Sequence, residues 1–156
     1  MTLESDWKRG DFTISTDPRY LDLAMISRFL GEEAYWSRGR TAEQVRRSID
    51  NSAMCFGIYT GALSEATPHQ VGFARLVSDM TTFAWLCDVF VLPEARGQGL
   101  GAWLVSLAAE TVRANGIRRV LLATRDAHAL YARYGFEPLA EPQRWMSLQV
   151  QALAGP

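Results

Sequence analysis

The first thirty residues contain an alternating segment followed by a segment with helical spacing. Residues 11–16, Asp-Phe-Thr-Ile-Ser-Thr, alternate polar and apolar side chains, which predicts a strand. Asp17 and Pro18 follow directly; Asp is a good N-cap residue and Pro suits the first helical position. Apolar residues at helical spacing come next, so we expect a first helix that ends near Gly31.

A second helix and three consecutive strands follow. The run Thr41-Ala-Glu-Gln44 is a capping-box pattern and predicts a helix that ends at about Asp50. The chain then changes to apolar segments bounded by turn residues, which predict strands over residues 53–60, 70–79 and 82–92. Their nearly continuous apolar character is typical of a central sheet covered on both faces.

The last third of the chain returns to alternating helices and strands. Residues 99–114 have a strong amphipathic pattern, and Asn115-Gly116 is a suitable C-cap for that helix. The remaining pattern predicts a strand over 118–123, a short helix over 127–134 and a closing strand pair over 136–139 and 144–148. This order of elements is an α/β (α+β) plan with a mixed sheet.

Composition and charge narrow the class of protein. The 156 residues are 48% hydrophobic and 21% charged, which fits one globular domain over 1–156, with 1–10 and 149–156 at its periphery. A net charge of −1 gives no field for holding nucleic acid or an anionic membrane. We find neither a secretory signal nor a membrane-spanning run. Cys55 and Cys87 lack metal-ligand spacing, so we expect no bound metal, two buried thiols and a cytoplasmic location.

The most informative segment is a glycine-rich run between a predicted strand and a predicted helix, Arg96-Gly97-Gln98-Gly99-Leu100-Gly101. Alternating glycines allow unusual backbone angles and close approach of a ligand. Free N–H groups at the start of a helix, together with the positive end of its dipole, form an anion site suited to a phosphate or pyrophosphate. Arg96 adds a further donor at this site.

The glycine run departs from two common nucleotide-binding motifs. A P-loop needs a Lys after its last glycine, and this run has none, which disfavours a nucleotide triphosphatase. A dinucleotide fingerprint is formally present in Gly97, Gly99 and Ala102, but a four-residue turn separates the strand from the first glycine. The acidic strand end of that fingerprint is also missing, since residues 118–119 are both Arg. Incidental glycines are disfavoured because glycine is costly inside helices.

Two motifs resemble those of the GNAT N-acetyltransferases. The run 96–101 is similar to the acyl-CoA loop of that family, Gln/Arg-x-x-Gly-x-Gly/Ala. Downstream, residues 127–136 resemble the family segment Ala-x-x-Leu-Tyr-x-x-x-Gly-Phe. The order of predicted elements also fits, so the resemblance covers about residues 11–148. It implies a mixed, mostly antiparallel central sheet of about six to seven strands, flanked by about four helices.

The resemblance implies an acyl-CoA-dependent N-acetyltransferase with acetyl-CoA as the donor. Val89, Phe90 and Val91 would line the pantetheine arm where their strand splays from its neighbour, leaving a backbone N–H to polarise the thioester carbonyl. Thr124 stands where the family often has an Asn that bonds the pantetheine, and Tyr131 matches the family tyrosine that protonates the leaving thiolate. The CoA pyrophosphate would be held by backbone N–H groups of Arg96, Gly97, Gln98, Gly99, Leu100, Gly101 and Ala102.

Direct acyl transfer to an amine needs a proton acceptor, an oxyanion donor and an acid for the thiolate, because aliphatic amines have a pKa near 10. Asp88 is the candidate acceptor, since it is the only charge in an otherwise apolar strand and an unpaired buried carboxylate has a raised pKa. The alternative is a structural Asp bonded to the backbone or to an Arg such as Arg75. Tyr131 is the candidate acid, with a packed helix tyrosine as its alternative.

In the fold of the family that this sequence resembles, the acceptor cleft lies between the first two helices, the strand that carries Asp88 and the final strand pair. The candidate acceptor-binding residues are Tyr35, Trp36, Arg75, Trp85 and Asp88. We expect a small-molecule primary amine as acceptor, with a peptide N-terminus or a lysine side chain as alternatives, and transfer within a ternary complex. The resemblance also implies a homodimer, since such domains often pair.

Two further classes of protein stay open from the sequence. A catalytically silent acyl-CoA-binding module, which senses or scaffolds, would keep the glycine loop without needing Asp88 or Tyr131. A dinucleotide oxidoreductase would bind NAD(P)H and not CoA. An acyl-cysteine route through Cys55 or Cys87 is disfavoured, because neither residue has an adjacent base or helix N-terminus to lower its thiol pKa.

Overall fold

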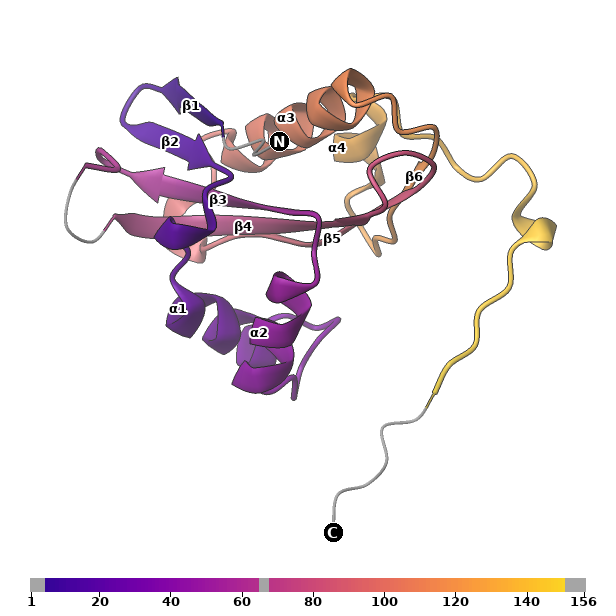
Figure 1. The fold of residues 1–156 in the computed structure, drawn as a ribbon, viewed down its shortest axis with the longest axis horizontal. Helices are drawn as coiled ribbons and strands as arrows, with labels where there is room; N and C mark the ends of the chain where they lie inside the picture. The colour runs from indigo at the N-terminus through magenta and orange to yellow at the C-terminus, as the bar shows by residue number, and fades with distance from the viewer. Residues whose placement is uncertain (1–4, 65–67, 151–156) are drawn as a thin grey trace, which may run out of the picture.

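A computed structural model describes residues 5–64 and 68–150, and within these ranges six strands form one sheet with four α-helices around it (Figure 1). The strands are β1 (Asp6–Arg9), β2 (Phe12–Ser15), β3 (Met54–Thr60), β4 (His69–Ser78), β5 (Ala84–Val91) and β6 (Val120–Leu121). The helices are α1 (Leu23–Arg28), α2 (Ala42–Asp50), α3 (Leu100–Ala114) and α4 (His128–Ala132). The strands lie in chain order, and every pair is antiparallel except β5 and β6, which confirms the predicted mixed, mostly antiparallel sheet.

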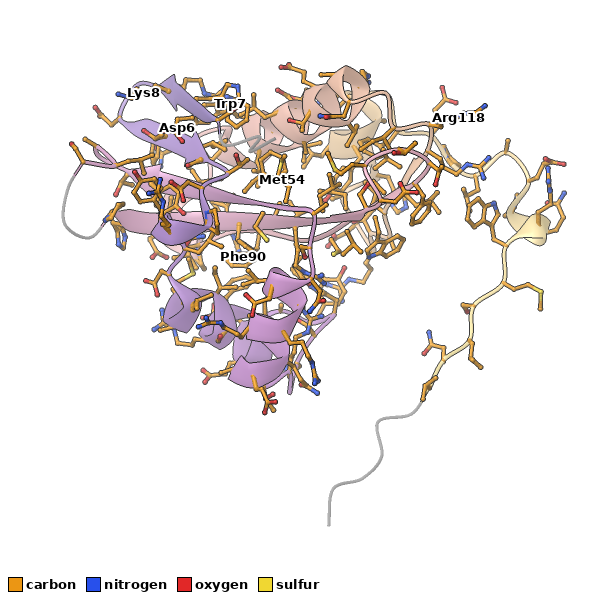
Figure 2. The ribbon with its side chains drawn as sticks, in the orientation of Figure 1. Asp6, Trp7, Lys8, Met54, Phe90 and Arg118 are labelled. Atoms are coloured by element: carbon orange, nitrogen blue, oxygen red, sulfur yellow. The ribbon has the colours of Figure 1, made fainter. Side chains whose placement is uncertain are left out.

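The two faces of the sheet are covered by different helices. In Figure 1, α3 and α4 lie on one face and α1 and α2 on the other. Met54 belongs to the core cluster under α3, whereas Phe90 belongs to the cluster under α1 and α2, and Figure 2 shows the two side chains on opposite sides of the sheet. Burial on both faces explains why β3 and the middle of β4 have nearly continuous apolar sequences.

The N-terminal end of the chain forms a strand that the sequence pattern does not predict. β1 pairs with β2 through a hairpin whose turn contains Gly10 at a φ of 58°. Trp7 is the only large apolar residue in residues 5–10, so the alternation is too short to indicate a strand. Its ring packs on Phe56 of β3. Of the predicted peripheral segment 149–156, residues 151–156 lie outside the described residues.

The helix predicted between Asp17 and Gly31 is broken in two. Asp17 caps a 3₁₀ turn at Pro18–Tyr20, and Leu21 then takes an extended conformation. Asp22 caps α1 by accepting a hydrogen bond from the Met25 amide. This second helix start coincides with a long-range contact: the side chain of Gln70 in β4 accepts a hydrogen bond from the Asp22 amide. No local sequence pattern predicts that contact. After α1, a π-helical turn at Phe29–Glu33 leads toward α2.

The C-terminal strand predictions are wrong for the described chain. The strand predicted over 118–123 shortens to the two residues of β6, and neither 136–139 nor 144–148 forms a strand. Instead a 3₁₀ turn at Pro142–Arg144 is followed by exposed extended chain that leaves the body of the molecule (Figure 1). The period-two pattern is present, but this chain provides no neighbouring strand for it to pair with. None of the described helices is both long enough and apolar enough to cross a lipid bilayer.

The predicted capping box at the start of α2 is confirmed. The Thr41 hydroxyl accepts from the Gln44 amide at 3.2 Å, and the Gln44 side chain accepts from the Thr41 amide at 2.9 Å. These two bonds satisfy backbone donors that the first helical turn would otherwise leave unpaired. Because Arg40 directly precedes this cap, the cap also determines where the Arg40 side chain emerges.

We expect Thr41→Ala to lower the free energy of unfolding by about 1 kcal/mol, because it removes the N-cap acceptor. Thr41→Ser keeps the hydroxyl and serves as the matched control. Urea denaturation followed by circular dichroism measures both variants. Equal midpoints for Thr41→Ala and the unmodified chain would show that the capping box does not stabilise α2.

Candidate active site

The turn between β5 and α3 presents a row of backbone amides that have no acceptor in the described parts of the chain. The amides of residues 97–102 make no hydrogen bond to backbone or side chain there. Gly97 and Gly99 have φ angles of 79° and 73°, the left-handed region in which glycine is unstrained. Free amides at the start of a 15-residue helix can bind an anion, and the anion site expected from the glycine pattern stays a prediction.

Side chains around the turn bind nearby carbonyl oxygens and leave the amides available. Arg96 donates from Nε to the Val91 carbonyl at 2.9 Å, and Gln98 donates to the Ala95 carbonyl. Arg9 of β1 donates to the Gly99 carbonyl at 2.9 Å. The space around Gly97 is open, since a Cβ placed there would meet no atom within 4 Å. An anionic group therefore has access to the amides from solvent.

β5 separates from β6 after two paired residues, as the resemblance implied for this strand. The parallel ladder joins Ala84 to Val120 and Trp85 to Leu121, and in the described chain β5 has no partner on that side beyond Trp85. A cleft of about 370 Å³ opens at this separation. Backbone groups of β5 can thus face a ligand in place of a neighbouring strand.

The three residues predicted to line the pantetheine arm differ in what they can offer. Val89 lines the cleft and is half-buried. The Phe90 ring points to the opposite face and stacks on Phe29 at 3.9 Å, so only its backbone is available to a ligand. Val91 lies against the glycine loop, where its Cγ2 would be 3.8 Å from a Cβ on Gly101.

Asp88 occupies a bulge in β5 and binds three side chains. The register of β4 against β5 shifts here, and Asp88 has a φ of 53°, which is rare for a residue with a side chain. Its Oδ2 accepts from Arg40 at 2.7 Å and from Arg75 at 2.9 Å, and its Oδ1 accepts from the indole of Trp36 at 3.0 Å. Asp88 is only 4% exposed, so the network is shielded from water.

The ion pairs decide the charge of Asp88. Burial by itself raises its pKa, but the charges and hydrogen bonds of Arg75 and Arg40 outweigh burial, so the pKa lies below its ordinary value. Asp88 is therefore ionised at neutral pH. The pairing with Arg75 that the sequence left as an alternative is present, and Arg40 joins it.

Tyr131 and Thr124 both line the cleft from the segment that follows β6. Tyr131 is 9% exposed, and burial together with the nearby Tyr35 raises the pKa of its phenol, so the hydroxyl keeps its proton at neutral pH. The Thr124 hydroxyl accepts a hydrogen bond from the Ala127 amide at 3.1 Å. Its own proton is left to donate to a ligand.

The cleft brings together every residue predicted for the acceptor site. Trp85 and Arg75 line it from the sheet, and Tyr35 and Trp36 lie at its mouth in edge-to-face contact, with rings 5.1 Å apart. The Arg125 guanidinium lies 3.9 Å from the centroid of the Tyr35 ring. Aromatic surfaces beside a buried charged network can hold a small polar molecule with an apolar portion.

Arg40 is the site residue that sequence reasoning missed. It belongs to the connection between the π-helical turn and α2, and it lines the cleft beside Asp88. No pattern around it indicates a buried ion pair, since it looks like any Arg that precedes a helix cap.

Neither cysteine has the properties of a nucleophile. Burial raises the pKa of the Cys55 thiol to about 12 and that of the Cys87 thiol to about 11, although Arg75 acts in the opposite direction. Cys87 lines the cleft as a neutral thiol, and both cysteines are free. The geometry therefore favours chemistry that needs no covalent enzyme intermediate.

Comparisons with known proteins agree with this arrangement. The sequence model of the Acetyltransferase (GNAT) family matches residues 21–136. A crystal structure from Xanthomonas campestris pv. campestris, described as belonging to the GNAT family, is 42% identical, covers 94% of this chain and 98% of its own, and superposes with a TM-score of 0.81. A Gibberella zeae protein provisionally named an acetyltransferase is 29% identical over 170 residues, which span 100% of this chain and 96% of that protein. The thialysine N-epsilon-acetyltransferase of Mus musculus is 32% identical over 74 residues, 45% of this chain and 44% of that protein.

We expect Asp88→Asn to lower the free energy of unfolding at neutral pH by about 3 kcal/mol, because it leaves two guanidinium groups without their buried partner. The pKa of Asp88 is lower in the folded chain than in the unfolded one, so its stabilisation is complete above about pH 4 and is lost as the pH falls through the folded-state value. The stability difference between the unmodified chain and Asp88→Asn should therefore close in acid. Asp126→Asn, at an exposed carboxylate of the same cleft, is the control and should show no such pH-dependent difference. Denaturant titrations at a series of pH values test this, and a difference that persists undiminished in strong acid would contradict the ion-pair assignment.

Proposed function

The chain belongs to the GNAT family of acetyltransferases, and from that premise we propose that it transfers an acetyl group from acetyl-CoA to the primary amine of a small molecule. The transfer is direct, with donor and acceptor bound together. The observation that carries the proposal is the row of free amides at residues 97–102, because it matches the charge and size of a pyrophosphate. The proposed setting is the cytoplasm, which is supported by two cysteines that remain free.

The residues present fit a CoA thioester. Amides of the glycine loop would hold the pyrophosphate, with the exposed Arg96 beside them. Val89 and Val91 would contact the pantetheine arm along the free edge of β5, and the Thr124 hydroxyl would donate a hydrogen bond to it. When bound there, acetyl-CoA supplies a thioester carbonyl that an amine can attack.

Three groups of the chain would then act on charges and protons. A backbone N–H near Val89 or Phe90, on the unpaired side of β5, would stabilise negative charge on the carbonyl oxygen. Tyr131, a neutral buried phenol, would give its proton to the departing sulfur. Asp88 would accept a proton from the amine nitrogen directly or through water, since its Oδ1 has a single protein donor and keeps a lone pair free.

The lowered pKa of Asp88 limits when it can accept that proton. An ionised carboxylate of low pKa is too weak a base to deprotonate a free ammonium of pKa near 10. The amine nitrogen becomes far more acidic once its lone pair is shared with a carbonyl carbon. We therefore place the transfer to Asp88 after attack, and we expect the incoming amine to bind in its neutral form.

A small amine suits the cleft better than a large acceptor. Its volume of about 370 Å³ is at the lower end of small-molecule sites. Tyr35, Trp36 and Trp85 supply aromatic surface, and the mouse relative is named a thialysine N-epsilon-acetyltransferase. These observations support a small-molecule amine as the acceptor class.

A silent acyl-CoA-binding module is the second candidate function. One observation favours it: the carboxylate of Asp88 is already engaged by two guanidinium groups. Such a module would bind acetyl-CoA and release no free CoA with any amine. The two candidates are therefore separated by turnover and not by binding.

The CoA site is tested with CoA itself, using Gly101→Glu and its uncharged match Gly101→Gln. A side chain fits at this position, because a Cβ on Gly101 would approach Val91 no closer than 3.8 Å. The added carboxylate should repel the pyrophosphate and weaken CoA binding at least tenfold relative to Gly101→Gln, since like charges near a protein surface cost roughly 2 kcal/mol at short range. Isothermal titration calorimetry gives both dissociation constants, and equal values would place the pyrophosphate elsewhere.

Catalysis is tested by measuring free CoA released from acetyl-CoA in the presence of a panel of amines, amino acids and peptides. With the acceptor found in this way, Tyr131→Phe should lower kcat by about a hundredfold or more and leave CoA affinity unchanged, because only the proton donor is removed. Tyr134→Phe is the control, as Tyr134 lies on the same segment but outside the cleft. No release with any amine would favour the silent binding module, and an unchanged kcat for Tyr131→Phe would remove its role as acid.

A further inference from the structure

Two guanidinium groups share one carboxylate in the cleft between β5 and β6. Arg40 and Arg75 both donate to Oδ2 of Asp88, at 2.7 and 2.9 Å. Asp88 is ionised and an Arg side chain keeps its proton in proteins, so the three groups together carry a surplus of one positive charge. An uncompensated charge that is partly withdrawn from water is costly. The network therefore favours an additional anion next to the guanidinium groups.

The other acidic side chain in the lining of the cleft does not cancel this surplus. Asp126 has a side chain that is 70% exposed, and its own nearest cation is Arg125 at 3.8 Å. Solvent and salt screen a charge at such exposure. Among the described residues, neither Arg40 nor Arg75 has a second carboxylate within ion-pair distance besides Asp88.

The two guanidinium groups differ in how firmly the fold holds them. Arg75 also donates from Nη1 to the Ser52 hydroxyl at 3.3 Å, and its side chain is only 13% exposed. A single guanidinium is enough to neutralise Asp88, so Arg75 can fill the structural role by itself. Arg40 is therefore the surplus cation of the network.

Arg40 also has the donors that a ligand needs. Its side chain lines the cleft and is 24% exposed, whereas the side chain of Asp88 beside it is 2% exposed, so an entering molecule meets the guanidinium first. Arg40 uses Nη1 for Asp88, and within the described chain its Nε and Nη2 donate to no partner. A guanidinium with unused N–H groups binds a carboxylate through two parallel hydrogen bonds.

We propose that the acceptor carries a carboxylate as well as its primary amine, and that Arg40, assisted by Arg75, binds this carboxylate. The inference rests on the proposed acetyl transfer and narrows its acceptor to small amino acids. The carboxylate would neutralise the surplus charge of the network. Tyr131 and Val89 line the same cleft of about 370 Å³, so one small molecule can place its carboxylate at Arg40 and its amine at the thioester.

The acceptor class is tested with amines that differ in the charge of a second group. Release of free CoA from acetyl-CoA is measured with glycine, β-alanine, γ-aminobutyrate and L-lysine, each beside its own amide. The best acid should have a kcat/KM at least roughly tenfold higher than its amide, because the amide cannot form a charge-assisted pair with the guanidinium. A carboxylate near the amine raises the amine pKa and lowers its neutral fraction, so greater reactivity of the amine cannot explain such a preference.

The outcomes separate this inference from the acetyl transfer on which it rests. Amides that are acetylated as well as the acids, or turnover confined to amines without an acid group, would overturn the acceptor class and leave the transfer standing. No release of CoA with any amine would refute the transfer, and the acceptor class with it.

The role of Arg40 is tested with Arg40→Gln, in which Arg75 still pairs with Asp88. The measured quantity is the ratio of kcat/KM for the preferred acid to kcat/KM for its amide. Both substrates present the same amine, so a general loss of activity or a disturbed fold cancels in the ratio. Arg40→Gln should lower the ratio at least about fivefold, because one charged hydrogen-bonding partner is lost.

Two further variants complete this test. Arg40→Lys keeps the charge without the fork of donors, so its ratio should lie between those of the unmodified chain and Arg40→Gln. Arg46→Gln is the matched control, since it removes an exposed guanidinium of α2 that is outside the cleft, and it should keep the full ratio. An unchanged ratio in Arg40→Gln would show that Arg40 only holds Asp88, which would overturn its role in binding the acceptor.

Discussion

The carboxylate of Asp88 joins segments that are far apart in the chain and belong to different layers of the fold. Trp36 and Arg40 come from the connection between the first two helices, Arg75 comes from β4, and all three donate to Asp88 in β5. Such a buried network contributes little net stability, because burial of the charges offsets their attraction. The consequence of the network is geometric. The layer formed by α1 and α2 packs on the sheet in the position where Trp36 and Arg40 reach the carboxylate of Asp88. The shape of the acceptor cleft follows from that docking.

The strand that carries Asp88 also forms the other half of the site. Beyond Trp85, β5 has no neighbour in the described chain on the side of β6, and it leads through a 3₁₀ turn at Pro93–Ala95 into the glycine loop. Arg9 binds the Gly99 carbonyl of the loop and Arg96 binds the Val91 carbonyl at the end of β5, so neither side chain occupies the loop amides. Arg9 belongs to β1, at the far edge of the sheet, so the anion site depends on both ends of the sheet being in place. β5 thus connects the Asp88 network, its own unpaired edge and the row of free amides at residues 97–102.

Much of the candidate site was predictable from short stretches of sequence. The glycine run 96–101 indicated free amides at a helix start. A lone Asp88 in an apolar strand indicated a buried carboxylate that either accepts a proton or pairs with an Arg. Arg40 was not predictable, since its partner lies 48 residues away and its neighbours in sequence describe only a helix start. The fold shows the same division: the capping box at Thr41 appears as expected, whereas the helix predicted after Asp17 breaks at Leu21, next to the contact between Asp22 and Gln70 of β4.

The sequence by itself determined the order of the helices and central strands, the starts of α2, α3 and α4, the glycine turn and the membership of a family. These features depend on residues close together in the chain, whose propensities and hydrogen bonds act over one or two turns. The tertiary structure decided the low pKa of Asp88, the separation of β5 from β6 and the fate of the last strand. Each of these depends on which distant segments meet, because a charge is set by its neighbours in space and a strand exists only where another edge can pair with it.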